Sequence, residues 1–205
     1  MSKPLLTRDA LIERLVEVVY DYGYDGATLS LISEVTGLGK ASLYHHFPGG
    51  KEQMAAEVLA HSDRWGAQHI GQLLASQLPA EARLRGLFDA LDRVHTRPHQ
   101  LTLMNVFTYG AARQVFGPQV AERVRAGLDV LAALLAECGV PLHEAQARAL
   151  DAYIQIEGAM VLARTLDDLE VFRKVVQRLP EALLRPLTAP PAATPEPATS
   201  SCATA

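Results

Sequence analysis

The sequence predicts an all-α protein, and three observations support that fold class. Apolar residues recur at intervals of three and four along most of the 205-residue chain, as they do on one face of an α-helix. Glycine and proline interrupt these runs where helices begin or end, as at Gly37, Pro79 and Gly139. No alternating polar and apolar segment is long enough to predict a strand.

Composition narrows the classes of function. The formal net charge is −4, and residues 1–60 contain five Lys and Arg against eight Asp and Glu. Any nucleic-acid binding must therefore depend on a few positive groups gathered on one face. The two cysteines, Cys138 and Cys202, form neither a disulfide framework nor a metal-ligand pattern. Without an apolar signal segment or a membrane span of about 18 apolar residues, we expect a cytoplasmic protein.

Three short helices are predicted at the N-terminus. A helix over Thr7–Tyr22 has one apolar face and ends at Gly23. Thr28 suits the N-cap of a second helix, and Gly37 suits the left-handed residue that ends it. A third helix follows over about Lys40–Phe47. In the last two helices, the apolar residues expected to face inwards are Leu29, Ile32, Val35, Leu38, Leu43 and Phe47.

The third helix leaves small and hydrogen-bonding side chains off its buried stripe, a composition that suits a DNA major groove. Tyrosine and lysine reach phosphates well, and short side chains let the helix approach the groove floor. His45 and His46 are adjacent, so they point in different directions and do not make a metal pair, but each is a candidate donor to DNA. The outward-facing residues are Lys40, Ala41, Ser42, Tyr44, His45 and His46.

The stretch TLSLISEVTGLGKASLYHHFPGGK, from Thr28 to Lys51, resembles the helix-turn-helix of the TetR family of transcriptional repressors. LYHHF followed by Lys51-Glu52 is its most specific part, and PGGKEQ is similar to a drug-resistance-type subgroup. Ser33 departs from the alanine usual in the family, and Pro48-Gly49-Gly50 makes the link to Lys51 one residue longer. The matching residues are Thr28, Ile32, Gly37, Leu38, Ser42-Leu43-Tyr44, His46-Phe47 and Lys51-Glu52.

The resemblance implies a role for each residue that matches the family's DNA contacts. It implies that Ala41, Ser42 and His45 face base edges. It implies that the DNA backbone is bound by Thr28, Tyr44, His46 and Lys51. Lys40 fits either role.

The rest of the chain predicts a larger helical domain. The resemblance implies that residues 1–50 form the DNA-binding domain and residues 51–187 the effector-binding and dimerisation domain. Residues 188–205, rich in Ala, Pro, Thr and Ser, are expected to be a disordered tail. A helix over 51–74 connects the two domains. The later helices, separated by glycine and proline, are expected over 80–97, 101–109, 111–116, 118–138, 143–165 and 169–179.

The helix over 143–165 has two apolar faces, so one can pack in its own domain and the other against a second subunit. Small residues on one face permit close helix packing. We expect a homodimer, formed through 118–138 and 143–165, that presents two recognition helices to a pseudo-palindromic double-stranded operator. The two faces are Ala149, Ala152, Ile156, Ala159 and Ala163, and Leu150, Ile154, Glu157 and Val161.

The resemblance also implies a small-molecule effector that releases the repressor from its operator. Aromatic side chains with a few polar groups suit a small amphipathic organic ligand, although each is also an ordinary core residue type. A buried Glu157 needs a partner, and Arg113, Arg164, a histidine, a second subunit and a cationic ligand all remain open. The candidate ligand-binding residues are Trp65, His69, Phe88, His95, Met104, Phe107, Tyr109, Tyr153, Glu157 and Met160.

No catalytic, metal or cofactor site is predicted. The sequence has neither a nucleophile elbow nor a phosphate-binding glycine loop, and Pro98 disrupts the helix face that His95 and His99 would need to share. Lys3 and Arg8 are candidates for a minor-groove arm, although a loose terminus is the simpler interpretation. Two alternatives stay open: a helical protein-interaction module without regulatory DNA binding, and a helical enzyme that uses Glu157 with a histidine.

Overall fold

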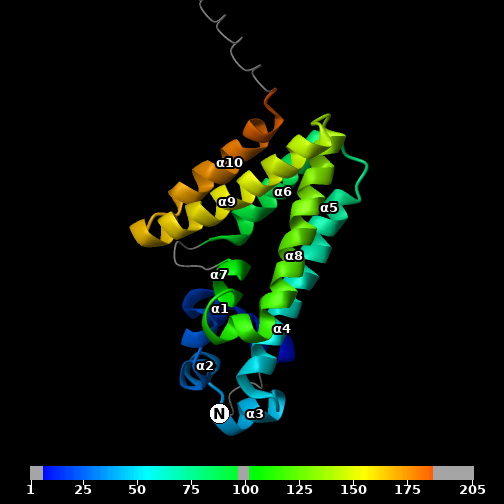
Figure 1. Cartoon of the computed structure of the whole chain (residues 1–205). Coiled ribbons are helices and arrows are strands. Elements are labelled where there is room, and N and C mark those ends of the chain that lie inside the picture. Colours follow the sequence, from blue (N-terminus) through cyan, green and yellow to red (C-terminus); the bar gives the residue numbers. More distant parts are fainter. Residues whose placement is uncertain (1–6, 97–101, 187–205) are drawn as a thin grey trace, which may run out of the picture.

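The computed structural model describes residues 7–96 and 102–186, and within those ranges it is helical without strands, which confirms the all-α class. The N-terminal helices lie at one end, and long helices lead from them to a helical layer at the other end (Figure 1). The elements are α1 (Arg8–Gly26), α2 (Leu29–Thr36), α3 (Lys40–His46), α4 (Gly50–Gly66), the π-helical turn η1 (Ala67–Gly71), α5 (Gln72–Leu74), α6 (Ala80–Val94), α7 (Leu103–Phe107), α8 (Gly110–Glu137), α9 (Leu142–Leu166) and α10 (Glu170–Leu184).

The predicted helix ends in the N-terminal module are confirmed. The Thr28 hydroxyl accepts a hydrogen bond from the Leu31 amide at 3.2 Å, as an N-cap does. Gly37 ends α2 in the left-handed conformation, with φ 69°. Gly23, with φ 70°, breaks the helical geometry of α1 near its end. Arg14 of α1 also caps the C-terminal end of α2. Its Nη1 donates to the carbonyl oxygens of Val35 and Thr36, the last two residues of α2, both at 3.1 Å.

One buried core joins α1–α4 to α7 and the first half of α8. Phe47 and Phe107 are fully buried in it, and the Phe107 and Phe116 rings meet edge to face with centroids 5.1 Å apart. The Tyr24 ring at the end of α1 also packs on Phe116, at 5.9 Å. The N-terminal helices therefore share their core with later helices, so a displacement of α7 or α8 reaches them directly.

A second core lies between α6, the second half of α8, α9 and α10. The alanine stripe predicted on α9 is buried there, since Ala149, Ala152 and Ala163 are inaccessible to solvent. Their small side chains allow α9 to pack closely on α8 and α10. Figure 1 shows α9 and α10 lying side by side at the end remote from α3.

The structure corrects two predicted breaks. The helices expected over 111–116 and 118–138 are one helix, α8, which continues through Gly117-Pro118. The helix expected to end before Pro180 continues to Leu184 as α10. Proline removes one backbone hydrogen bond from a helix interior, at a cost of about 3 kcal/mol. Burial of Phe116 and Val120 around the first proline, and of Leu179 and Leu183 around the second, offsets this cost.

Other boundaries agree with small shifts. The long connecting helix expected over 51–74 is formed by α4, η1 and α5 in succession, with one wider π-helical turn. Residues 97–101, which include His99, and the tail over 188–205 lie outside the described residues, as does Lys3. Among residues 7–96 and 102–186, no helix is both long and apolar enough to cross a membrane.

The left-handed Gly37 provides a test of this local structure. We expect Gly37→Ala to lower the free energy of unfolding by about 1–2 kcal/mol, because a Cβ disfavours positive φ. Urea unfolding at fixed protein concentration measures the change. Gly39→Ala is the matched control, since Gly39 has φ −66° and open space around its Cβ position. Equal effects of the two changes would contradict the assigned C-cap.

Candidate DNA-binding surface

Helix α3 is anchored by its apolar side and leaves its polar side open. Leu43 and the following Phe47 are fully buried, which fixes how the helix is rotated on the module. The rotation exposes the side chains predicted to face outwards, with Tyr44 47% exposed and His46 half-buried. The exposed members are Lys40, Ala41, Ser42, Tyr44 and His45, and Thr28 is exposed at the start of α2.

Arg8 holds three helices of the module together. Its Nη1 donates to the His46 carbonyl oxygen at 3.3 Å, and its Nη2 pairs with the Glu57 carboxylate of α4. The guanidinium also lies 5.2 Å from the centre of the Phe47 ring. Arg8 is thus a residue of α1 with its side chain half exposed, and its contacts hold it on the module. Sequence reasoning missed this role because its partners are far away along the chain.

A tight turn absorbs the additional residue between α3 and α4. The Gly50 amide donates to the Phe47 carbonyl oxygen at 2.8 Å, and Gly50 has a positive φ of 63°. A Cβ on Gly50 would lie 3.4 Å from the Tyr44 ring, so the tyrosine packs against this turn while its other side remains exposed. The Gln53 side chain accepts from the Gly49 amide at 2.9 Å and closes the start of α4.

Lys51 is held against the end of α1. Its Nζ donates to the Asp25 carbonyl oxygen at 3.1 Å and lies 4.6 Å from the centre of the Tyr24 ring. Burial lowers the pKa of Lys51, and the nearby Asp25 carboxylate partly opposes that change. The lysine is therefore bound to a segment of α1 that also contacts α7 and α8.

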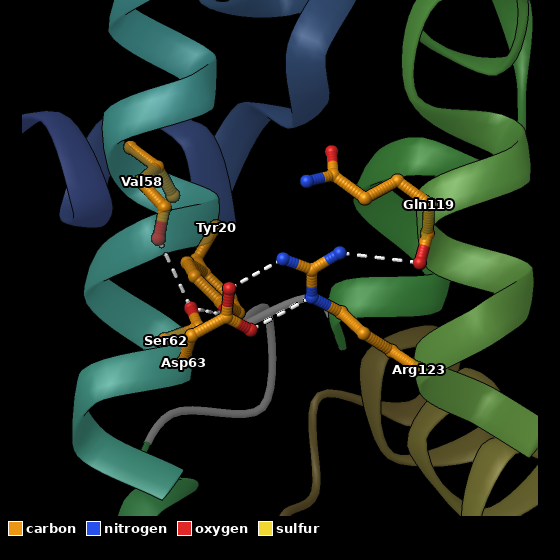
Figure 2. Close-up of polar contacts among 6 residues, drawn as sticks. All are labelled: Tyr20, Val58, Ser62, Asp63, Gln119 and Arg123. Atoms are coloured by element: carbon orange, nitrogen blue, oxygen red, sulfur yellow. Dashed lines mark hydrogen bonds and ion pairs between the residues drawn. The ribbon is translucent and has the colours of Figure 1, made fainter. Parts of the chain in front are cut away.

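Helix α4 is tied to both α1 and α8 by polar contacts that Figure 2 shows. Arg123 of α8 donates through Nε to Asp63 Oδ1 at 2.7 Å, and its Nη2 contacts the other carboxylate oxygen. The Tyr20 hydroxyl lies 2.9 Å from Ser62 Oγ, and the Ser62 hydroxyl donates to the Val58 carbonyl oxygen at 3.2 Å. This Asp63–Arg123 clasp fixes the direction in which α4 leaves the module.

The structure distributes the candidate ligand-binding residues over several places. Trp65 and His69 stack with ring centroids 4.8 Å apart, and His69 is exposed. Phe107 belongs to the first core, whereas Met104 is half-buried on α7 and Tyr109 is 69% exposed. The residues that lie in or against the second core are Phe88, Tyr153 and Met160.

His95 is a buried residue at the end of α6. Its Nδ1 lies 3.0 Å from the Leu91 carbonyl oxygen, and its ring packs 5.0 Å from that of Phe172. Burial lowers the pKa of His95, which favours the neutral imidazole at neutral pH.

Glu157 has neutral partners. The Thr102 hydroxyl and the Asn105 side-chain amide each donate to its Oε2 at 2.8 Å. The sequence left the partner of Glu157 open among Arg113, Arg164 and other groups. Among the described residues, the partners are Thr102 and Asn105. Burial raises the pKa of Glu157, and the hydrogen bond from Thr102 partly offsets the rise. The carboxylate thus connects α9 to the start of α7.

Two short helices joined by a tight turn, the second anchored on its apolar side and open on its polar side, have the arrangement of a helix-turn-helix. The profile of the bacterial regulatory proteins of the tetR family matches residues 11–58. Residues 11–58 therefore form a domain of the tetR family of bacterial regulatory proteins.

Two curated relatives match part of the chain. The transcriptional regulator LmrA of Bacillus subtilis is 36% identical over 76 residues, which cover 37% of this chain and 40% of LmrA. The transcriptional repressor KstR2 of Mycolicibacterium smegmatis is 35% identical over 89 residues, 43% of each chain. The chain thus matches less than half the length of either relative.

The whole fold is also found among solved structures. A cysteine-substituted form of the TetR family regulator CifR, in complex with a 26-base-pair double-stranded operator DNA, aligns with a TM-score of 0.68. The alignment covers 89% of this chain and 99% of the CifR chain, at 19% sequence identity. At that identity, the likeness establishes the fold.

The buried Glu157 gives a pH-dependent prediction. The pKa of Glu157 is raised in the folded protein above its ordinary value of 4.5. The protonated carboxyl group therefore contributes to the free energy of unfolding below pH 4.5, and this contribution is lost as the pH rises through the pKa of the folded protein. We expect Glu157→Gln, which retains an acceptor oxygen for Thr102 and Asn105, to raise the Tm by about 2–4 °C at pH 8 and by less at pH 4.5. Thermal unfolding at both pH values measures this difference.

The control for this test is Glu122→Gln, because Glu122 is exposed on α8. A Glu157→Gln variant that is less stable at pH 8 than at pH 4.5, relative to the wild type, would show that the carboxylate is favoured in the fold.

Proposed function

We propose that the protein is a homodimeric, sequence-specific DNA-binding repressor of transcription. A small amphipathic organic effector releases it from a pseudo-palindromic operator. The observation that carries this proposal is the geometry of α3, in which buried Leu43 and Phe47 present the opposite side of the helix to solvent. Of the relatives named above, LmrA is a transcriptional regulator and KstR2 a transcriptional repressor.

The side chains on the open side of α3 have the chemistry for two kinds of DNA contact. Ala41, Ser42 and His45 are short or can donate hydrogen bonds, so we assign them to base edges in the major groove. Tyr44, His46, Thr28 and Lys51 reach the phosphates, and Lys40 adds charge beside them. Because few positively charged side chains contact the phosphates, the affinity for DNA is expected to be modest and to weaken with rising salt concentration.

Helix α9 supports the dimer. Opposite its buried alanines, it exposes an apolar stripe that covers much of its length, including Ile154 at 60% and Leu166 at 61%. Val130 on the neighbouring α8 is 40% exposed. A contiguous apolar surface of this kind marks a site of interaction with a partner. An isologous pairing through 118–138 and 143–165 would bury this surface on both subunits. The other exposed members of the stripe are Leu150, Val161 and Leu162.

Two-fold pairing would place two copies of α3 on the same side of the dimer, because α2 and α3 lie at the end remote from α9 (Figure 1). An effector shifts DNA binding only if it binds the DNA-competent dimer and the released dimer unequally. We assign effector binding to the residues predicted in α4–α9, among them Glu157 with its donors Thr102 and Asn105.

The DNA-binding assignment predicts a specific loss in Lys51→Ala. A fragment from upstream of the protein's own gene should bind the variant more weakly. The slope of log affinity against log salt concentration should also become shallower by about 1, since one phosphate contact is lost. Fluorescence anisotropy over a salt series measures both quantities. Lys174→Ala is the control, because Lys174 is exposed on α10. Unchanged affinity and slope in Lys51→Ala would refute this contact.

The dimer assignment predicts that Ile154→Glu yields a folded monomer, since it buries a charge in the proposed interface. Light scattering after size exclusion should give the chain mass of 22.2 kDa for the variant and twice that mass for the wild type. The control is Leu78→Glu, because Leu78 is 50% exposed between α5 and α6. The assignment fails if the Ile154 variant remains dimeric, or if the wild type is monomeric.

A further inference from the structure

A hollow of about 310 Å³ opens where the end of α1, helix α7 and the end of α9 meet. Figure 1 shows α7 directly beside α1 at the joint between the DNA-binding end and the rest of the molecule. The volume lies at the lower end of the range for small-molecule sites. This hollow is separate from the second core, where several of the predicted effector residues lie.

The walls of the hollow are rich in aromatic side chains. Three tyrosines line it, and two of them are well exposed, Tyr22 at 56% and Tyr109 at 69%. The third, Tyr24, is held from behind by the packing of its ring on Phe116. Exposed tyrosine rings around one concavity suit a planar aromatic ligand, which stacks on them and covers their apolar faces.

Two opposite charges complete the lining. Arg164 is exposed on α9, two helical turns beyond Glu157 and on the same side of the helix. Within the described ranges, no hydrogen bond or ion pair engages its guanidinium. Asp25 lies against the start of α8, because a Cβ on Gly110 would be 1.9 Å from its Oδ2. The glycine, with φ 56°, thus makes room for this carboxylate at the edge of the hollow.

We propose that this hollow binds a small hydroxylated aromatic carboxylate. The ligand ring lies among the tyrosines, its carboxylate accepts two hydrogen bonds from Arg164, and its hydroxyl donates to the Asp25 carboxylate. The side-chain amide of Asn105 already donates hydrogen bonds to Glu157 and Thr102. A ligand that approaches Asn105 therefore also lies beside the hydrogen bonds that join α7 to α9. A ligand of about ten non-hydrogen atoms should bind with a dissociation constant on the order of 0.1–1 mM.

Occupation of the hollow would act on Lys51. Tyr24 and Asp25, which line the hollow, are the two residues that hold the lysine ammonium. A ligand packed on them favours the state in which Lys51 stays bound to α1, and so competes with a phosphate for this side chain. This effect on DNA rests on the proposed repressor function, whereas binding to the hollow does not.

Calorimetry with 4-hydroxybenzoate on the full chain tests the site. We expect saturable binding that weakens at least tenfold in Arg164→Gln and is unchanged in Arg93→Gln, since Arg93 is exposed on α6 outside the hollow. Benzoate should bind more weakly than 4-hydroxybenzoate to the wild type, and this preference should disappear in Asp25→Asn. Cyclohexanecarboxylate and 4-hydroxybenzyl alcohol, which lack the aromatic ring and the carboxylate respectively, should bind least.

Two results overturn the proposal: no saturable binding at about 10 mM ligand, well above the expected dissociation constant, or equal affinity in Arg164→Gln and Arg93→Gln. A DNA-binding measurement distinguishes failure of the ligand site from failure of the proposed repressor function. If 4-hydroxybenzoate binds but no DNA does, the repressor function fails and the site stands. If DNA binds, the ligand should lower the affinity of the wild type severalfold and leave that of Lys51→Ala unchanged. An equal effect on both proteins would exclude the coupling through Lys51.

Discussion

The packing of α1 against α7 and α8 connects the DNA-binding end to the rest of the molecule. Phe107 and Phe116 reach from the later helices into the core of the N-terminal helices, and Tyr24 completes the contact from α1. Close-packed side chains have little room to yield, so α1 cannot keep its position if α7 or α8 moves. The orientation of α3 depends in turn on α1, because Arg8 and Arg14 bind the ends of α3 and α2.

A second connection runs along α4. The Asp63–Arg123 clasp and the contact of Tyr20 with Ser62 fix this helix to α8 and α1 (Figure 2). An exposed ion pair contributes little to stability, about 0.2–1 kcal/mol, but its two parallel hydrogen bonds restrict direction. The π-helical turn begins at Ala67, after Asp63 in the chain. The part of α4 that Asp63 fixes is therefore regular α-helix, continuous with the start of α4 in the N-terminal module.

Local signals in the sequence predicted the parts of the fold that local forces determine. Thr28 and Gly37 act through their own backbone neighbours, and the alanines of α9 through helical periodicity, so both patterns were visible without the structure. The continuity of α8 and α10 through proline was not, because tertiary burial outweighs the local cost.

The exposed side of α3 followed from the position of its two buried residues and from the family resemblance together. The Arg8–Glu57 pair, the Asp63–Arg123 clasp and the partners of Glu157 join residues 49, 60 and more than 50 positions apart, respectively, and leave no periodic signal. The hollow at the end of α1 likewise depends on three segments that only the fold brings together.

Selection of DNA sequences by the purified protein tests the central claim most directly. Random duplexes enriched by the wild type should converge on an inverted repeat, and a variant carrying Ser42→Ala and His45→Ala should select altered half-sites with the same spacing. That result would show that α3 reads base edges in a symmetric dimer. No enrichment by the wild type, or identical half-sites for both proteins, would contradict the account.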